Sequence, residues 1–132
     1  MTKDNAQANA RDEIQHGNES LAAAQCLVAN GFLRDAVSRA YYAAYHWARA
    51  VLLTKGLEAK THRGTIQLFS LHFVKDGPLS DDAAALLAHL ETYRELSDYT
   101  STVSFTETQV HEEITRAERF IQTCRPLVQD LP

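Results

Sequence analysis

SRAYYAAYHWAR, residues 38–49, is the stretch of sequence that decides the fold. Within it Ala40, Ala44 and Trp47 recur at spacings of four and three, which places them on one face of an α-helix. The many alanines predict that a neighbouring helix approaches this face closely. We therefore expect a core helix over about residues 32–55, in the middle of an all-α protein.

Four further segments have a helical period, and short breaks separate all five. The strongest breaks are Gly31, Gly56, Asp76-Gly77-Pro78 and residues 100–105. Helix starts are predicted at Thr61, at Ser80 and at the capping-box pattern from Thr106 to Gln109. We expect an up-and-down antiparallel bundle of about five helices. Residues 1–10 are predicted to be a flexible N-terminus, and residues 11–130 to be a single helical domain.

Composition limits the partners. The chain of 132 residues is 45% hydrophobic and 23% charged, which is ordinary for a globular protein. Its net charge is −4 and its pI is about 5.8, which argues against a broad basic face for duplex DNA. A small basic pocket for RNA or a nucleotide stays compatible with these values.

The cellular location is predicted from two features that the sequence lacks, a membrane-spanning stretch and a signal peptide. Charged residues interrupt every apolar stretch before it is long enough to cross a bilayer, and the polar N-terminus has no signal-peptide core. We therefore expect a cytoplasmic protein that does not contact membranes. Cys26 and Cys124 lie at helical core spacings and are predicted to be buried, reduced thiols.

A polar face runs along the central helix. Its members, spaced by three, four and three, are Arg39, Tyr42, His46 and Arg49. One interpretation is that the aromatic side chains pack with their polar tips toward water or a neighbouring helix. The other is that the set forms a polar groove or a surface for self-association.

Arg94 lies four residues after Leu90, close to the apolar stripe of the fourth segment. A half-buried guanidinium needs an anionic or hydrogen-bonding partner because its desolvation is costly. Asp98, four residues on, is the local candidate, and Tyr99 ends the same turn. Either Arg94 and Asp98 form an ordinary surface pair, or Arg94 is held in a cleft to meet a phosphate. We favour the second interpretation.

Other ligand signals are weaker. The start of the third helix, Lys60-Thr61-His62-Arg63, is either a plain N-cap or a place where an anion binds. A di-iron bundle would need two Glu-x-x-His motifs on different helices, and such a pair is missing. Cys-x-x-Cys, Walker A and Gly-rich dinucleotide motifs are missing too. We therefore expect neither a metal nor a cofactor.

Taken together, four motifs resemble the HEPN-domain family. They are RAYYAAYH from Arg39 to His46, the following stretch that ends in Lys55-Gly56, the Lys60-Thr61-His62 loop, and RELSDY from Arg94 to Tyr99. The likeness is to the branch with an R-A-Y-Y-A-x-x-H helix and a later R-x-x-x-D-Y, and it covers about residues 20–124. It implies a helical bundle that is usually a homodimer and is often paired with a minimal nucleotidyltransferase as a toxin–antitoxin system.

The resemblance also implies a chemistry, from which this sequence departs. Many active HEPN proteins are metal-independent ribonucleases in which an R-x(4–6)-H motif acts on the ribose 2′-hydroxyl and the phosphate. Here four residues separate Arg94 from Tyr99, and no histidine occurs between Glu95 and Val110. A tyrosine with a pKa near 10 is a poor general base at neutral pH. An imidazole would have to come from elsewhere, either His46 or His62.

Three functions stay open at this point. The preferred one is a nucleotide- or RNA-binding and protein-interaction module that works with a nucleotidyltransferase. The alternatives are an active ribonuclease toxin and a structural assembly bundle without a ligand. The catalytic candidates are Arg94, Asp98 and Tyr99, and the groove candidates are Arg39, Tyr42, His46, Arg49 and His62.

Overall fold

The computed structural model describes residues 2–131, and within this range it is built from α-helices without strands. The helices are α1 (Lys3–Ala29), α2 (Leu33–Leu53), α3 (His62–Phe69), α4 (Asp81–Tyr99) and α5 (Glu107–Cys124). A π-helical turn, η1 (Ser70–Lys75), extends α3, and a 3-10 turn, η2 (Arg125–Val128), follows α5. The prediction of an all-α bundle of about five helices is confirmed.

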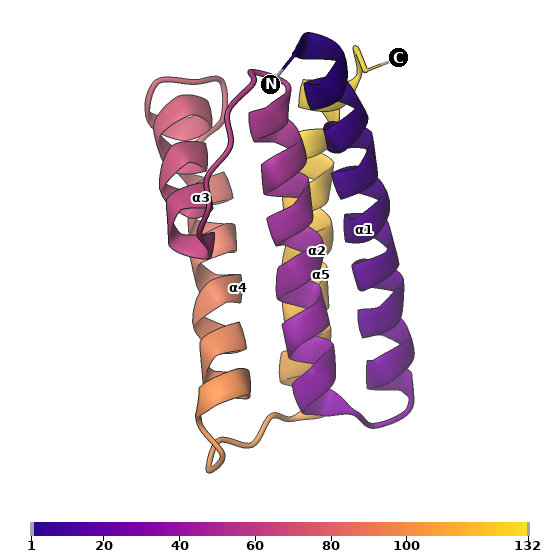
Figure 1. Ribbon diagram of the computed structural model, residues 1–132. Helices are drawn as coiled ribbons and strands as arrows, with labels where there is room; N and C mark the ends of the chain where they lie inside the picture. Colours follow the sequence, from indigo (N-terminus) through magenta and orange to yellow (C-terminus); the bar gives the residue numbers. More distant parts are fainter. Residues whose placement is uncertain (1, 132) are drawn as a thin grey trace.

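The four long helices lie along a common axis, and the short α3 lies beside α4 (Figure 1). α1 and α2 are antiparallel, as are α4 and α5. The loop of residues 54–61 departs from simple alternation, because it runs back along the bundle so that α3 points the same way as α2. Both ends of the chain lie at one end of the bundle.

α2 is the central helix and contacts each of the other α-helices. Its buried face carries the predicted core residues, with Ala40 and Ala44 fully buried and Trp47 only 2% exposed. Small side chains let the neighbouring backbones come close. α1 and α2 come close at Gly17, where an added Cβ would lie 2.6 Å from Cδ1 of Trp47.

The predicted helix ends are largely observed. The Thr61 side chain accepts a hydrogen bond from the backbone N–H of Gly64 at 2.9 Å, and Thr106 and Gln109 form the full capping box. Ser80 precedes α4 without a side-chain capping bond. Gly31 and Gly56 have φ values of 80° and 69°, in the left-handed region that ends helices at low cost for glycine.

Helix α1 extends into the N-terminal segment that the sequence predicts to be flexible. α1 begins at Lys3, where the Thr2 side chain accepts a hydrogen bond from the N–H of Asn5. Ala6 is 5% exposed, and Ala10 is fully buried against Ala50 and Leu53. Single alanines among polar residues give a weak apolar signal, so the sequence does not predict this part of the helix. Met1, also in the predicted tail, lies outside the described residues.

The two cysteines have different environments, and neither forms a disulfide. Cys124 is fully buried, as predicted, and burial raises the pKa of its thiol well above the ordinary value. Cys26 is exposed, so the prediction that it is buried is wrong. It lies two residues from both Ala24 and Val28, and two residues turn a helix by about 200°.

The described residues contain no helix that combines the length and the apolar character needed to cross a membrane.

Candidate functional site

Arg94 is directed from α4 toward α2 and is only 7% exposed. Its guanidinium carbon lies 5.0 Å from the ring centre of Tyr41 and 5.8 Å from that of Tyr99. One terminal nitrogen, Nη1, lies 3.4 Å from Oδ2 of Asp98 and 3.5 Å from the Tyr99 hydroxyl. Its Nε has no hydrogen-bond partner among the described residues. The three catalytic candidates are therefore in mutual contact.

Tyr41 links Arg94 to His62, although the sequence did not identify it as a site residue. It is fully buried, and its hydroxyl lies 2.9 Å from Nδ1 of His62. The His62 ring also stacks on Tyr45 at 4.2 Å and meets the edge of Tyr42 at 5.6 Å. The sequence contained a signal for Tyr41, because a guanidinium on an apolar stripe needs a partner such as an aromatic face.

The electrostatics of this cluster favour a neutral imidazole. Burial lowers the pKa of His62 below its ordinary value of 6.5, and the nearby charge of Arg94 lowers it further. Burial and the charge of Glu91 raise the pKa of Tyr41, so its phenol stays protonated. In one tautomer the phenol donates to Nδ1 of His62. In the other, Nδ1–H donates to the phenol oxygen and leaves the Nε2 lone pair free to accept a proton.

The predicted polar face of α2 divides into two parts. Tyr42 belongs to the aromatic cluster, and the Arg39 guanidinium lies 4.7 Å over its ring. His46 and Arg49 reach α1, where they contact the two oxygens of Glu13, and both also lie beside the ring of Tyr45. The distances are 2.6 Å from His46 Nδ1 to Oε2 and 3.5 Å from Arg49 Nε to Oε1.

Glu13 attracts these side chains because it is an acid on the neighbouring helix. Burial alone would raise the pKa of Glu13, but the hydrogen bond from His46 and the charge of Arg49 outweigh it, and the pKa lies below the ordinary value. Arg49 also pairs with Glu58 at 3.3 Å. Of the two histidines that sequence offered as a source of imidazole, the structure therefore brings His62 to Arg94 and His46 to Glu13.

Arg34 of α2 holds the end of α4 and is a second residue that the sequence did not identify. Its guanidinium donates to the carbonyl oxygens of Leu96 at 3.4 Å and Thr100 at 3.1 Å, and also to those of Ser97 and Val103. The Ser97 hydroxyl donates back to the Arg34 carbonyl at 2.8 Å. These bonds fix the last turn of α4, from which Tyr99 projects with 77% of its surface exposed.

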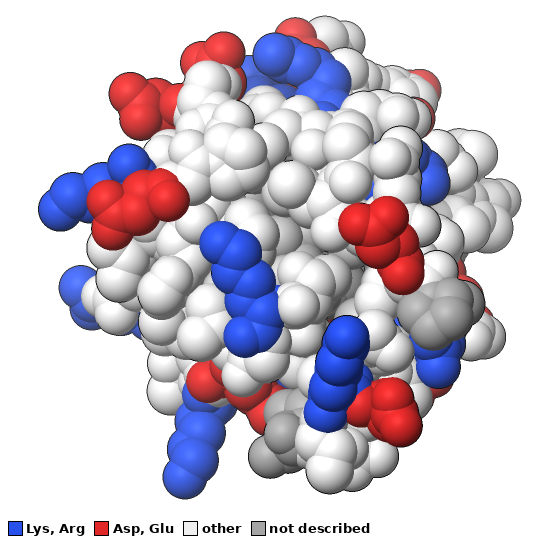
Figure 2. Space-filling view, turned by 90° about the horizontal axis from the view of Figure 1, so that it is seen from above, with Lys and Arg blue, Asp and Glu red and all other residues white. Residues whose placement is uncertain are grey.

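Charged side chains of both signs share the end of the bundle where the termini lie (Figure 2). Blue Lys and Arg atoms and red Asp and Glu atoms alternate there with uncharged surface. The described residues at this end of the bundle therefore present no broad basic face.

The family model described as HEPN domain matches residues 10–127. The chain belongs to the HEPN domain family. The family resemblance of the RAYYAAYH and RELSDY motifs is thereby confirmed. In this HEPN domain both motifs lie at one site, because Tyr41 and Tyr42 come from the first and Arg94 and Tyr99 from the second.

Curated relatives of this HEPN domain come from archaea and bacteria. It is 38% identical over 125 residues to a protein of Methanocaldococcus jannaschii named "Putative toxin MJ0605", with 92% of each chain covered. It is 33% identical over 117 residues to a UPF0332 protein of Thermotoga maritima, with 89% of each chain covered.

A solved structure supports the fold of the HEPN domain. The crystal structure of TT1696 from Thermus thermophilus superposes with a TM-score of 0.77, covering 89% of this chain and 97% of the other. Because the two chains are only 19% identical, this likeness is evidence for the bundle and not for the site.

Proposed function

We propose that this chain is a toxin-like HEPN module of the cytoplasm that binds RNA or a nucleotide at Arg94. In this proposal it acts as a homodimer and works with a nucleotidyltransferase partner. The family match supports the module, and two M. jannaschii relatives have names that contain the word toxin. The homodimer and the partner are what the family resemblance implies.

The geometry around Arg94 is the observation that carries the ligand proposal. Its guanidinium has an unpartnered Nε, and only long contacts of 3.4 and 3.5 Å engage Nη1. Charge-assisted bonds to a phosphate are typically 2.7–2.9 Å, about 0.6 Å shorter than these contacts. A phosphate oxygen would therefore compete well with Asp98 for this guanidinium.

A ligand would reach the Arg94 guanidinium past Asp98 and Tyr99, which both contact it. Asp98 and Tyr99 cover the guanidinium, and both side chains belong to exposed residues. Rotation of the Tyr99 side chain would open Arg94 to solvent and leave its ring free to stack on a base. Stacking on an aromatic side chain is worth about 1–3 kcal/mol per base, which favours single-stranded RNA or a nucleotide over duplex DNA.

A matched pair of variants tests this proposal. Fluorescence anisotropy with a labelled single-stranded RNA, and calorimetry with ATP, should show binding by the wild type and at least about tenfold weaker binding by Arg94→Met. Arg119→Met, which removes an exposed arginine from α5, should bind as the wild type does. Equal binding by Arg94→Met would contradict the proposal, and so would a wild type that binds neither ligand.

The partner and the dimer need separate measurements. Analytical ultracentrifugation should give twice the chain mass of 14.8 kDa. Co-expression with the nucleotidyltransferase encoded beside the gene should yield a complex that survives gel filtration. A monomer that forms no such complex would contradict the proposed homodimer and the proposed partner. Ligand binding at Arg94 is tested separately by the variants above.

The position of His62 favours a second candidate function, metal-independent RNA cleavage. The neutral imidazole of His62 is joined to Arg94 through Tyr41, so it could accept the proton of a ribose 2′-hydroxyl while Arg94 binds the phosphate. The 2′-oxygen would then attack phosphorus, the bond to the 5′-oxygen would break, and that oxygen would take a proton from the His62 imidazolium or from water. The products would be a 2′,3′-cyclic phosphate and a 5′-hydroxyl end.

Cleavage is tested in the presence of EDTA. His62→Ala and Arg94→Met should each abolish the cyclic-phosphate product and relieve growth inhibition in cells, whereas His111→Ala should not. If neither variant changes binding, cleavage or growth while substitution of Trp47 or Leu90 unfolds the chain, the remaining interpretation is a structural assembly bundle. An inactive wild type that still binds RNA would leave the binding module as the function.

A further inference from the structure

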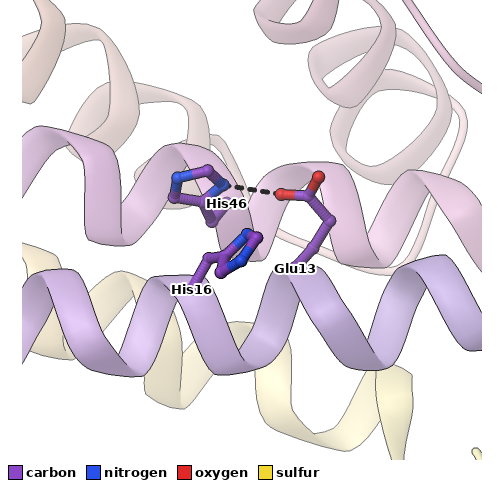
Figure 3. A group of neighbouring side chains, drawn as sticks. All are labelled: Glu13, His16 and His46. Atoms are coloured by element: carbon purple, nitrogen blue, oxygen red, sulfur yellow. Dashed lines mark hydrogen bonds and ion pairs between the residues drawn. The ribbon is translucent and has the colours of Figure 1, made fainter.

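Glu13, His16 and His46 form a second cluster on the side of α2 that faces α1. Each residue offers one ligand atom, and these atoms all lie within 4.8 Å of one another. Glu13 and His16 are three residues apart and therefore share one face of α1. His46 projects from α2 toward both of them (Figure 3).

We propose that these three side chains bind a divalent transition-metal ion, with Zn²⁺ as the best match. Two imidazole nitrogens and one carboxylate oxygen form a donor set typical of zinc. Bonds of about 2.0–2.1 Å in a tetrahedron place ligand atoms about 3.4 Å apart. His46 Nδ1 and Glu13 Oε2 are already closer than this, at 2.6 Å. Rotation of the exposed His16 side chain would close the remaining gap.

The second oxygen of Glu13 already has a partner that would orient the carboxylate. Oε1 contacts Arg49 at 3.5 Å, whereas Oε2 contacts His46. An ion that replaces the proton between Oε2 and the His46 ring leaves the Arg49 contact intact. Arg49 would then orient the Glu13 carboxylate without binding the metal itself. Groups that contact the ligands of a metal site commonly have this role.

An open coordination position lies beside the two histidines. A surface pocket of about 290 Å³ adjoins the cluster and is lined by His16, Glu19, Ser20, Ala23, Arg39 and His46. Three protein ligands with an open fourth position are typical of zinc sites that bind water or an exchangeable ligand, whereas purely structural sites use four protein ligands. The proposed ion would therefore join α1 to α2 and stay accessible from this pocket.

This inference does not depend on the proposed function, because none of the three proposed ligands contacts Arg94, although His46 lies beside Tyr45 of the aromatic cluster. The sequence contained its signal, the single Glu-x-x-His motif from Glu13 to His16. A di-iron site needs two such motifs. This site needs only one, because its third ligand is a single histidine, His46, from another helix.

Titration calorimetry with ZnCl₂ tests the site. The wild type should bind one ion per chain, and His16→Ala should weaken binding at least about tenfold while leaving the circular dichroism spectrum unchanged. Zn²⁺ should also raise the melting temperature of the wild type, because it binds the folded chain, and should raise that of His16→Ala less. Co²⁺ in place of Zn²⁺ should give visible absorption bands that His16→Ala loses.

Two controls separate this site from other surface ligands. His111→Ala removes an exposed histidine that lies 3.5 Å from Glu107, a pair without a third ligand in the described structure. Cys26→Ser removes the exposed thiol. Both variants should bind Zn²⁺ as the wild type does. A wild type that takes up no Zn²⁺, a His16→Ala variant that binds equally well, or a loss of binding in Cys26→Ser would each overturn the proposal.

Discussion

The guanidinium of Arg94 lies 5.0 Å from the ring centre of Tyr41, so the cation expected to face a phosphate is packed against the central helix. The hydroxyl of the same tyrosine contacts His62, which belongs to the start of α3. One buried ring thus connects α2, α3 and α4. Changes at Arg94 are therefore expected to affect stability and the ionisation of His62, as well as ligand binding.

Replacing Arg94 by methionine should lower the free energy of unfolding by about 1 kcal/mol. A buried cation over an aromatic ring contributes about this much, and methionine keeps most of the apolar stem. Urea denaturation followed by circular dichroism measures the change. Arg119→Met should stay within about 0.5 kcal/mol of the wild type, as exposed substitutions usually do. Equal stability of the two variants would show that the contact with Tyr41 contributes little.

The imidazole of His62 should titrate below 6.5, because burial and Arg94 lower its pKa. The folded chain then binds fewer protons at His62 than the unfolded chain, so this contribution to stability is complete above pH 6.5 and is lost as the pH falls through the folded pKa. NMR titration of the ring protons measures the midpoint directly. Arg94→Met should raise it, whereas Arg119→Met should leave it unchanged. A midpoint above 6.5 would contradict this electrostatic description.

Arg34→Ala should loosen the last turn of α4 and the loop after it. Four backbone carbonyls would lose the guanidinium as a donor, and those of Leu96 and Thr100 would keep only a backbone N–H donor. A hydrogen bond to a charged group contributes about 1.5–3 kcal/mol. Hydrogen exchange of residues 96–103 should speed up, while exchange in α1 should change little. Arg34→Lys should rescue only partly, because an ammonium group lacks the planar fork that reaches several carbonyls. If residues 96–103 exchange as slowly in Arg34→Ala as in the wild type, this role of Arg34 is contradicted.

Local sequence patterns predicted the helices well. They did not predict which side chains meet at the site, because contacts between helices decide that. The apolar period of α2, the Thr106 capping box and the glycine ends are encoded within a few residues of each other. The polar face of α2 has the same kind of period, yet Glu13 on α1 draws His46 and Arg49 away from Arg94. No spacing within α2 contains that information.

Gly17→Ala should destabilise the chain although alanine is the better helix former. The gain in helix propensity is about 1 kcal/mol. The new Cβ would lie 2.6 Å from Cδ1 of Trp47, a buried ring whose Nε1 donates to Asn18 at 3.1 Å and so resists movement. Overpacking of this kind costs about 1–3 kcal/mol. A melting curve should show a lower Tm, and Gln25→Ala on the exposed side of α1 should not.

Glu113 on α5 provides a test of a buried charge. It is fully buried, and its Oε1 lies 2.7 Å from His89 Nε2 and 2.8 Å from Arg116 Nη1, while Oε2 has no hydrogen-bond partner in the described structure. Burial raises the pKa of this carboxyl above 4.5 in spite of the hydrogen bonds from its neighbours His89 and Arg116. Between pH 4.5 and the folded pKa, the folded chain therefore holds a proton at Glu113 that the unfolded chain has lost.

It follows that the contribution of Glu113 to stability is complete below pH 4.5 and is lost as the pH rises through the folded pKa. Glu113→Gln keeps the shape and an oxygen for Arg116 without the titration. The free energy of unfolding of the wild type, minus that of Glu113→Gln, should fall with rising pH by at most about 1.4 kcal/mol per pH unit. Urea titrations at several pH values measure this difference, with the exposed Glu112→Gln as the control. A difference that rises with pH would mean that His89 and Arg116 outweigh the cost of burial, and that Glu113 is ionised in the folded chain.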